Sequence, residues 1–248
     1  MNSFLVGEKG AVLQNLYVNS INIAYNVNTV NIEFGRPKNL TVVKSKGDSG
    51  RSYHHGDLKE ALLKASLELV SEKGPHGFTL AEVCRKAGVS VAAPYRHYRD
   101  REALLAAIAL TGFEHQFEVL SQAVNECPDK TFEALRALAD RYVNFAIANP
   151  STYRVMFGSD LSKAKFPELY ATARRAFEVV FCTVEKCLIA EKKTTENTYA
   201  LSVSMWSHCH GIAMLCVDGF LREIAMDERV SELIYLAVES FVSQIRKN

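Results

Sequence analysis

One short stretch of the chain gathers side chains that bind phosphate. Residues 95–101 contain two tyrosines, one histidine and three arginines: Tyr95, Arg96, His97, Tyr98, Arg99 and Arg101. The wider segment 85–101 also holds Arg85 and Lys86 and has a single acid, Asp100, so its local charge is +5 − 1 = +4, whereas the whole chain carries a formal net charge of +1. Local clustering of cations in an otherwise balanced chain is typical of phosphate binding on nucleic acid.

The residues just before this basic stretch are small. Ser90, Val91 and Ala92 let a backbone approach base edges closely, and their methyl groups suit contact with thymine. We therefore predict that residues 90–92 face bases. The phosphate contacts are expected from side chains and helix N-termini around them, namely Thr79, Tyr95, Arg96, His97 and Arg101.

Three successive helices must position these residues. The first is expected from Asp57, as N-cap, to about Lys73, ending at Gly74-Pro75. The second opens with Thr79 and Glu82 at capping-box spacing and ends at Gly88. A third helix is expected over 91–98, capped by Ser90 with Pro94 in its first turn. The tight turn between the second and third helices predicts a helix-turn-helix with a small core of Leu80, Val83, Cys84, Ala87, Val89 and Tyr98.

The rest of the chain continues as helices with apolar residues at three-to-four spacing. The expected segments are a long helix from Asp100 to about Val124, then 131–148, a short turn at 151–157, and finally 167–191, 197–222 and 227–246. We predict an all-α protein. An N-terminal three-helix helix-turn-helix domain is expected to precede a C-terminal helical bundle.

Residues 57–105 resemble the DNA-binding domain of TetR-family transcriptional regulators. The segment FTLAEVCRKAGVSVAAPYRHYRDREALL follows that family's Thr…Ala-Gly-Val-Ser…Tyr-x-His-Phe…Lys-x-x-Leu signature. Tyr98 stands where Phe is usual, Arg101 replaces Lys, and Ala92-Ala93-Pro94 replaces a Gly-x-x stretch, which leaves the base preference open. The resemblance implies a homodimer that binds double-stranded operator DNA. Its second domain is expected to bind a small molecule and change the distance between recognition helices, whose half-sites lie about 34–36 Å apart.

The C-terminal half resembles one subclass of the family through Trp206-x-x-x-His210-Gly211 and through Pro150, Tyr153 and Phe157 in NPSTYRVMFG. From spacing alone, Trp206, His210 and Met214 share one helix face. Aromatic side chains elsewhere supply further candidate walls of a pocket. The predicted ligand-binding residues are Phe113, Phe117, Tyr153, Phe157, Phe177, Trp206, His210 and Met214. The alternative is that this aromatic stripe is core or dimer interface, with Gly211 serving close helix packing.

The predicted function is a ligand-responsive transcriptional regulator, a repressor that an unknown small-molecule effector releases from its operator. The alternative is an architectural or cell-division DNA-binding protein on the same fold without a ligand. No hydrolase, P-loop, HExxH or dinucleotide motif occurs, so we expect no enzyme and no cofactor. No metal site is expected either, since His208 and His210 face different sides of a helix. The six cysteines form no CxxC pair and are expected to be reduced thiols. A thiol sensor is a further alternative, because Cys209 and Cys216 lie seven positions apart on one helix face and Cys182 and Cys187 share another helix.

The first 50 residues differ from the rest. They are Asn-rich with strand-like alternation, and we expect a poorly ordered extension over 1–50, a DNA-binding domain over 51–105 and a regulatory domain over 106–248. An alternative is that translation begins later, at Leu40, Val42 or Val43. Basic residues at 51, 54 and 55 suit a minor-groove arm. Without a signal peptide or a run of 18 apolar residues, a cytoplasmic, nucleoid-associated protein without a membrane span is expected.

Overall fold

The computed structural model describes residues 55–158, 161–162 and 164–247. The chain divides into residues 1–50 and 51–248, and everything described belongs to the second unit. Every regular element in this part of the chain is helical, which confirms the all-α prediction. The predicted N-terminal extension and two arm residues, Arg51 and His54, lie outside the described residues, and His55 is the first residue of helix α2.

The DNA-binding domain is built from α2 (His55–Lys73), α3 (Leu80–Ala87) and a 3-10 turn, η1 (Pro94–Arg96). Both predicted ends of α3 are present: the Thr79–Glu82 capping box begins it, and Gly88 ends it in the left-handed conformation with φ +68°. Val83, Cys84 and Tyr98 are buried, and the other predicted core residues, Leu80, Ala87 and Val89, pack partly buried against them.

The predicted third helix does not form. Residues 91–93 make turns, and only η1 is helical. An α-helix here would need an N–H at position 94 to donate to the Ser90 carbonyl, and proline has none. That carbonyl instead accepts from the Ala93 N–H at 3.0 Å, and His97 and Tyr98 donate to the Pro94 carbonyl. Ser90 therefore caps no helix, and the recognition element is a chain of single turns.

The other predicted boundaries differ less. Asp57 lies within the first turn of α2 rather than before it. Asp100 caps α4 (Arg101–Asn125) by accepting from the Ala103 N–H, as expected. The helix predicted over 197–222 stops at Val217, because Gly219 takes a positive φ of +79°, and a short α9 (Phe220–Glu223) follows.

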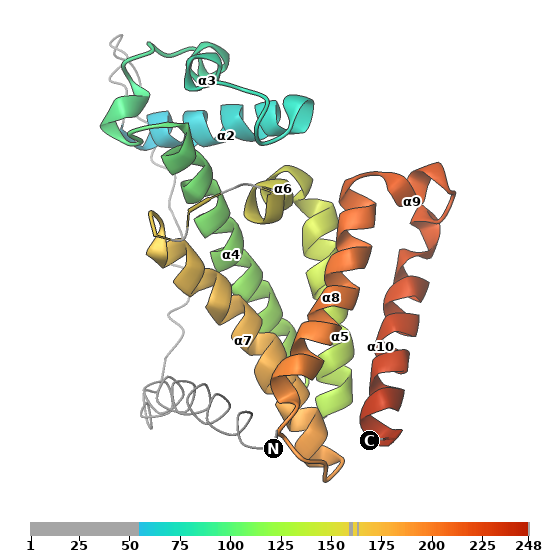
Figure 1. Ribbon diagram of the computed structural model, residues 1–248. Helices are drawn as coiled ribbons and strands as arrows, with labels where there is room; N and C mark the ends of the chain where they lie inside the picture. The colour runs from blue at the N-terminus through green and yellow to red at the C-terminus, as the bar shows by residue number, and fades with distance from the viewer. Residues whose placement is uncertain (1–54, 159–160, 163, 248) are drawn as a thin grey trace, which may run out of the picture. The chain divides into compact units, whose positions relative to one another are not determined.

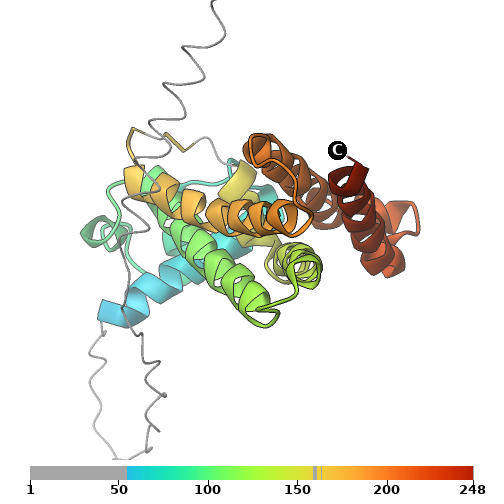
Figure 2. The ribbon, with the colours of Figure 1, turned by 90° about the horizontal axis from the view of Figure 1, so that it is seen from below.

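The C-terminal bundle is packed around α4. Helix α7 (Pro167–Ala190) lies along α4, and α5 (Thr131–Ala148) packs on both (Figures 1 and 2). Helix α8 (Thr198–Val217) packs on α5 and α7, α10 (Val230–Lys247) covers α5 and α8, and η2 (Asp227–Arg229) leads into α10. The short α6 (Pro150–Gly158) contacts α4 and α2, so it touches both the bundle and the DNA-binding domain.

Two of these helices, α4 and α8, are long and apolar enough to cross a membrane by length and composition, a property that helices in protein cores share. They differ in burial. Half of the most apolar stretch of α4 is buried, against 28% for α8. Helix α8 therefore has fewer fully buried residues than α4, and its Tyr199 and Leu215 are exposed in the single chain.

Candidate DNA interface and effector cavity

The six residues predicted to read DNA around η1 are exposed together: Ser90, Val91, Ala92, Tyr95, Arg96 and His97. Val91 and Tyr95 each keep 59% of their surface exposed, although both are large and apolar enough to be buried. Exposed apolar side chains beside basic ones suit a DNA surface, because apolar groups can contact the thymine methyl in the major groove. The structure therefore presents this segment as one accessible surface.

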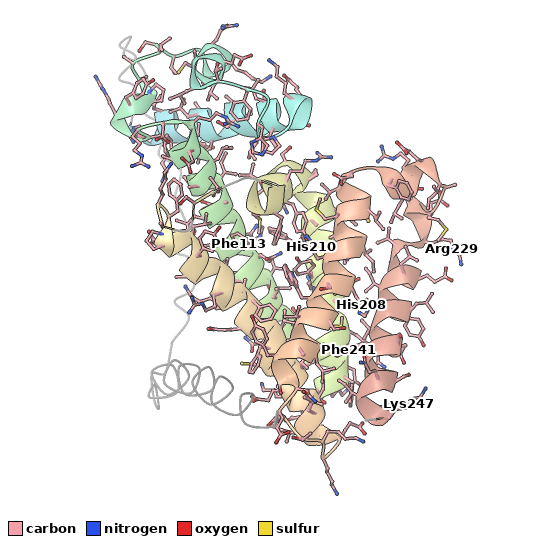
Figure 3. The ribbon with its side chains drawn as sticks, viewed as in Figure 1. Phe113, His208, His210, Arg229, Phe241 and Lys247 are labelled. Carbon is pink, nitrogen blue, oxygen red and sulfur yellow. The ribbon has the colours of Figure 1, made fainter. Side chains whose placement is uncertain are left out.

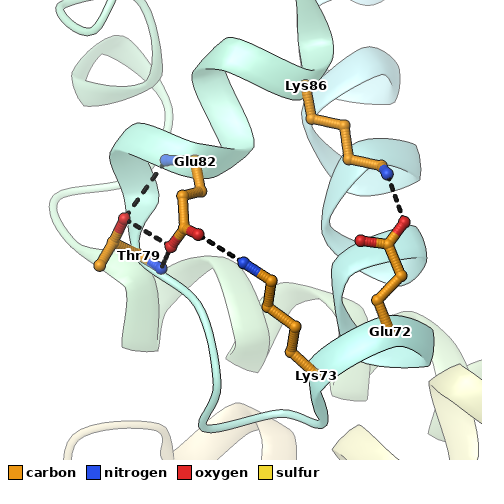
Figure 4. A network of polar contacts seen from close by, with 5 residues as sticks. All are labelled: Glu72, Lys73, Thr79, Glu82 and Lys86. Atoms are coloured by element: carbon orange, nitrogen blue, oxygen red, sulfur yellow. Dashed lines mark hydrogen bonds and ion pairs between the residues drawn. The ribbon is translucent and has the colours of Figure 1, made fainter.

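Most of the basic cluster is already paired within the protein. Lys86 bridges to Glu72 at 2.7 Å and to Glu68 at 3.3 Å (Figure 4). Arg99 pairs with Asp100 at 3.0 Å. In the described part of the chain this leaves Arg85 and Arg96 as the cluster's exposed arginines without an ion pair, so the local charge of +4 overstates the cations free for phosphate.

Arg101 has an internal role. Its guanidinium donates to the Pro75 carbonyl and lies 4.9 Å from the centre of the Phe78 ring. The Nε atom is buried without a partner. Arg101 thus ties the start of α4 to the loop between α2 and α3, a role that competes with the predicted phosphate contact.

Thr79 is likewise engaged. Its backbone N–H donates to Glu82 Oε2 at 2.8 Å, and its hydroxyl accepts from the Glu82 N–H at 3.3 Å (Figure 4). Lys73 holds the same carboxylate at 2.6 Å. Hydrogen bonds from Lys73 and Thr79 lower the pKa of Glu82 to about 2. The expectation that the Thr79 amide is free for phosphate is therefore wrong, because Glu82 occupies it.

A cavity of about 400 Å³ lies among α4, α5, α6, α7 and α8, which is within the size range of small-molecule sites. Four of the eight predicted ligand residues line it: Phe113, Phe157, Phe177 and Trp206. Phe113 on α4 is labelled in Figure 3, as is His210 on α8. The remaining lining residues are Gln116, Leu120, Tyr142, Tyr170, Ala173, Arg174, Ala176, Val180, Tyr199 and Val203.

Two further predicted residues form a polar cluster behind the cavity wall. Tyr142 OH accepts from Trp206 Nε1 at 2.8 Å and from Tyr153 OH at 3.0 Å. His210 Nδ1 lies 2.7 Å from Tyr153 OH and 3.2 Å from Tyr142 OH. Burial raises the pKa of both tyrosines and lowers that of His210, so at neutral pH the cluster is uncharged. The hydrogen bond from Trp206 to Tyr142 holds the indole ring in place in the cavity wall.

Phe117 and Met214 do not line the cavity. Phe117 lies under the Arg175 guanidinium, 4.4 Å from its ring centre, and Met214 packs on the core. Gly211 does not serve helix packing within the chain, since a Cβ there would meet no atom within 4 Å. Helical spacing predicts which residues share one face of a helix, but it does not predict which of them line a cavity.

Sequence reasoning missed the polar lining residues Gln116, Tyr142, Arg174 and Tyr199. A signal existed for Gln116, a polar residue four positions from both Gly112 and Leu120 on the apolar face of α4. The redox alternative loses support at two buried thiols. Burial raises the pKa of Cys209 to about 12 and that of Cys187 to about 11, so neither is a reactive thiolate at neutral pH.

Two family models match separate parts of the chain. A family model described as "Bacterial regulatory proteins, tetR family" matches residues 62–108, and one described as "Tetracyclin repressor-like, C-terminal domain" matches residues 135–241. The uncharacterized HTH-type transcriptional regulator YobS of Bacillus subtilis is 26% identical over 195 residues, 78% of this chain and 95% of its own. The HTH-type transcriptional regulator BetI of Yersinia pestis is 24% identical over 139 residues, covering 54% of this chain and 70% of its own.

Solved structures show the same fold. A protein of unknown function from Rhodococcus sp. RHA1 superposes with a TM-score of 0.66 at 29% identity, covering 79% of this chain and 98% of that chain. The TetR-family transcriptional regulator PfmR of Thermus thermophilus gives a TM-score of 0.62 at 18% identity, with 73% and 97% covered.

An exposed reading segment in one domain and a cavity in the other define a DNA-binding regulator of the helix-turn-helix class. The two family models, the relatives and the fold narrow this further: the chain belongs to the TetR family of transcriptional regulators. Members of this family bind operator DNA and typically act as dimers.

Proposed function

We propose that the protein is a repressor that leaves its operator when a small molecule fills the cavity. The contacts of α6 support this proposal best. Phe157 on α6 lines the cavity, and the next residue, Gly158, accepts a hydrogen bond through its carbonyl from His76 Nε2 at 2.9 Å. His76 belongs to the loop between α2 and α3, so one residue step separates the cavity wall from the DNA-binding domain.

A ligand that moves Phe157 therefore shifts a direct contact of the helix-turn-helix. Helix α6 also packs on α4 and α2, so a displacement reaches both helices that orient the recognition segment. A ligand that binds more tightly to the conformation with α6 displaced shifts the population of the protein toward that conformation. The cavity itself argues against the architectural alternative, which predicts a filled bundle core.

On the DNA side, we assign base contacts to residues 90–92 and phosphate contacts to Tyr95, Arg96 and His97, with Arg85 as an added cation. Residues 90–92 and Arg96 are exposed, and Arg85 and Arg96 keep their charge free of ion pairs among the described residues. The site of action is then DNA of the cytoplasmic nucleoid. Thr79 and Arg101, which were also expected to bind phosphate, act as positioning residues for α3 and α4.

We further propose a homodimer formed by α8 and α10. Large apolar side chains are exposed on these helices and on α9 between them: Leu215, Phe220, Ile224, Tyr235 and Leu236. A second copy of the same surface would cover them, and two recognition segments would then meet two half-sites.

The test is binding of the purified protein to fragments of its own gene neighbourhood at two salt concentrations. We expect one fragment to form a tight, salt-sensitive complex with a palindromic footprint. Arg96→Ala should weaken binding to all sequences and reduce the salt slope by about one, since one phosphate contact is lost. Arg101→Ala should leave the slope unchanged and lower the melting temperature instead.

The matched control is Arg141→Ala, an exposed arginine on α5 that should alter neither measure. Weak, equal binding to every fragment would favour the architectural function. A reduced salt slope for Arg101→Ala would return that residue to the phosphate-binding set.

A further inference from the structure

The cavity contains a buried amide donor that makes no full hydrogen bond within the protein. Gln116 is only 2% exposed, it lines the cavity, and its Nε2 atom has no hydrogen-bond partner. The amide lies close enough to lower the pKa of Tyr142 slightly, against the larger rise from burial, but it makes no full hydrogen bond there. A buried amide donor without a partner is unfavourable, so a ligand that supplies an acceptor gains a hydrogen bond there.

The deep end of the cavity suits a neutral acceptor. The residues there that carry polar groups are Gln116 and Tyr142, and Tyr142 OH already accepts from Trp206 and Tyr153. His210 behind them is held neutral by burial, which lowers its pKa. A carboxylate or an ammonium would find no opposite charge at this depth, whereas a carbonyl oxygen needs only the Gln116 donor.

The rim is different, because it carries a cation. Arg174 is the sole charged residue among the described residues that line the cavity, and it is exposed, as are the neighbouring Tyr170 and Tyr199. No ion pair is recorded for it in the described chain, not even with Glu178 one turn further along α7. The adjacent Arg175, by contrast, lies over Phe117. A rim with an unpaired cation and no acid attracts an anion and repels an amine.

The walls between rim and floor are aromatic. Phe157 and Phe177 lie 6.4 Å and 6.1 Å from the Trp206 ring, centre to centre, and Phe113 adds a further face. These rings contact one another and give the cavity an aromatic lining, which favours a flat apolar or aromatic ligand. The lining therefore combines a buried neutral donor, aromatic walls and an exposed cation.

We propose that the cavity binds an aromatic organic acid, with a neutral hydrogen-bond acceptor on Gln116, a ring system between the aromatic walls and a carboxylate at Arg174. The regulatory meaning of this binding rests on the proposed repressor function, but the binding itself does not.

The probe is 3-(6-acetylnaphthalen-2-yl)propanoate, which carries the acceptor, the rings and the carboxylate in this order. Three analogues each change one feature: an ethyl group in place of acetyl, the methyl ester, and the amine in place of the acid. Calorimetry on the full chain measures affinity. Trp206 is the only tryptophan in the chain, so quenching of its fluorescence reports binding in this cavity.

We expect the acetyl acid to bind about tenfold more tightly than the ethyl acid, since one buried hydrogen bond is lost. It should bind about fivefold more tightly than the ester, as for one partly exposed ion pair, and more tightly than the amine by a wider margin. An ester or amine that binds as well as the acid would overturn the assignment, and so would equal binding of the acetyl and ethyl compounds. These comparisons use the unmodified protein and do not depend on a variant folding.

Variants then locate each preference. Gln116→Leu should abolish the preference for acetyl over ethyl while keeping the preference for acid over ester. Arg174→Gln should do the reverse. Arg175→Gln is the matched control, because Arg175 follows Arg174 in the sequence but lies over the Phe117 ring. This variant should keep the preference for acetyl over ethyl and the preference for acid over ester. Persistence of both preferences in both variants would place the ligand elsewhere and refute the proposal.

A separate measurement of operator binding distinguishes this proposal from the repressor function. If the acid binds by calorimetry but leaves the operator complex intact, the ligand class stands and ligand-induced release fails. If an operator is found and none of the four compounds quenches Trp206, the ligand class fails and the regulator stands.

Discussion

Thr79, Glu82 and Lys73 form a small charged cluster that begins α3. The carboxylate of Glu82 accepts from the Thr79 N–H at 2.8 Å and from Lys73 Nζ at 2.6 Å. Both contacts require the ionised acid, and they lower its pKa from 4.5 to about 2. The stabilisation is therefore present above pH 4.5 and is lost as the pH falls toward 2, because the unfolded chain takes up the proton first.

Glu82→Gln should remove this part of the acid sensitivity. We expect the variant to melt below the native protein at about pH 7 and the two melting temperatures to converge as the pH falls from 4.5 to about 2. The measurement is the melting temperature across that range. Glu60→Gln, at an exposed acid on α2 for which no ion pair is recorded among the described residues, is the control. A difference that does not shrink at low pH would contradict the assignment.

At the scale of single residues, the sequence predicted local hydrogen bonds well and long-range partners poorly. The Thr79–Glu82 box followed from its spacing, because a capping box is a local interaction within four residues. The ion pair of Lys86 with Glu72 and the contact of Arg101 with Pro75 join residues 14 and 26 positions apart. Contacts between residues this far apart leave no regular spacing in the sequence by which to predict them. The number of cations near η1 that are free to bind phosphate was therefore overestimated.

At the scale of elements, the contact between α4 and α6 is set by Gly112. A Cβ at this position would lie 2.6 Å from Met156 Sδ and 2.8 Å from Thr152 Cγ2, both on α6. The glycine therefore allows α6 to lie close to α4, where Phe157 reaches the cavity and Gly158 reaches His76.

Gly112→Ala should destabilise the protein by about 1–3 kcal/mol, because α6 must move to accommodate the methyl group. Gly211→Ala is the matched helical control and should stabilise by up to about 1 kcal/mol, since its Cβ meets nothing in the chain. Urea unfolding at fixed protein concentration measures both. If Gly112→Ala were as stable as the native protein, the close approach of α4 and α6 would not be a constraint.

The recognition segment shows where element prediction failed. Helices α3, α4 and α5 begin and end close to where caps, glycine and proline placed them, because these signals act within one turn. Pro94 was expected to be tolerated in the first turn of a helix over 91–98, and this underestimated its effect on the backbone hydrogen bonds. In so short a segment, one missing hydrogen bond leaves too few others to hold a helix.

At the scale of the whole molecule, several large apolar residues of α8 and α10 and of the segment between them are exposed in the described part of the single chain. Tyr235 and Leu236 on α10 are 57% and 54% exposed. On α8, Leu215 is 41% exposed. Exposed large apolar residues on neighbouring helices favour an association site.

The double variant Tyr235→Glu, Leu236→Glu should be a monomer and should lose high-affinity operator binding, because two half-sites no longer bind one particle. Sedimentation gives the mass, and circular dichroism checks that the helices remain. Ile147→Glu, 42% exposed on α5, introduces a charge at another apolar site and should leave the dimer intact. A dimeric double variant would move the interface away from α10.

The sequence by itself determined most of the helices, the caps at Thr79, Gly88 and Asp100, and the family resemblance, because each depends on spacing within a few residues. Only the tertiary structure decided that Arg101 lies on Phe78, that four of eight predicted residues line the cavity, and that Gln116 points there without a partner. Where helices leave a void depends on how side chains from five helices fill the space together. That sum of volumes and contacts is not encoded in the pattern of any one helix.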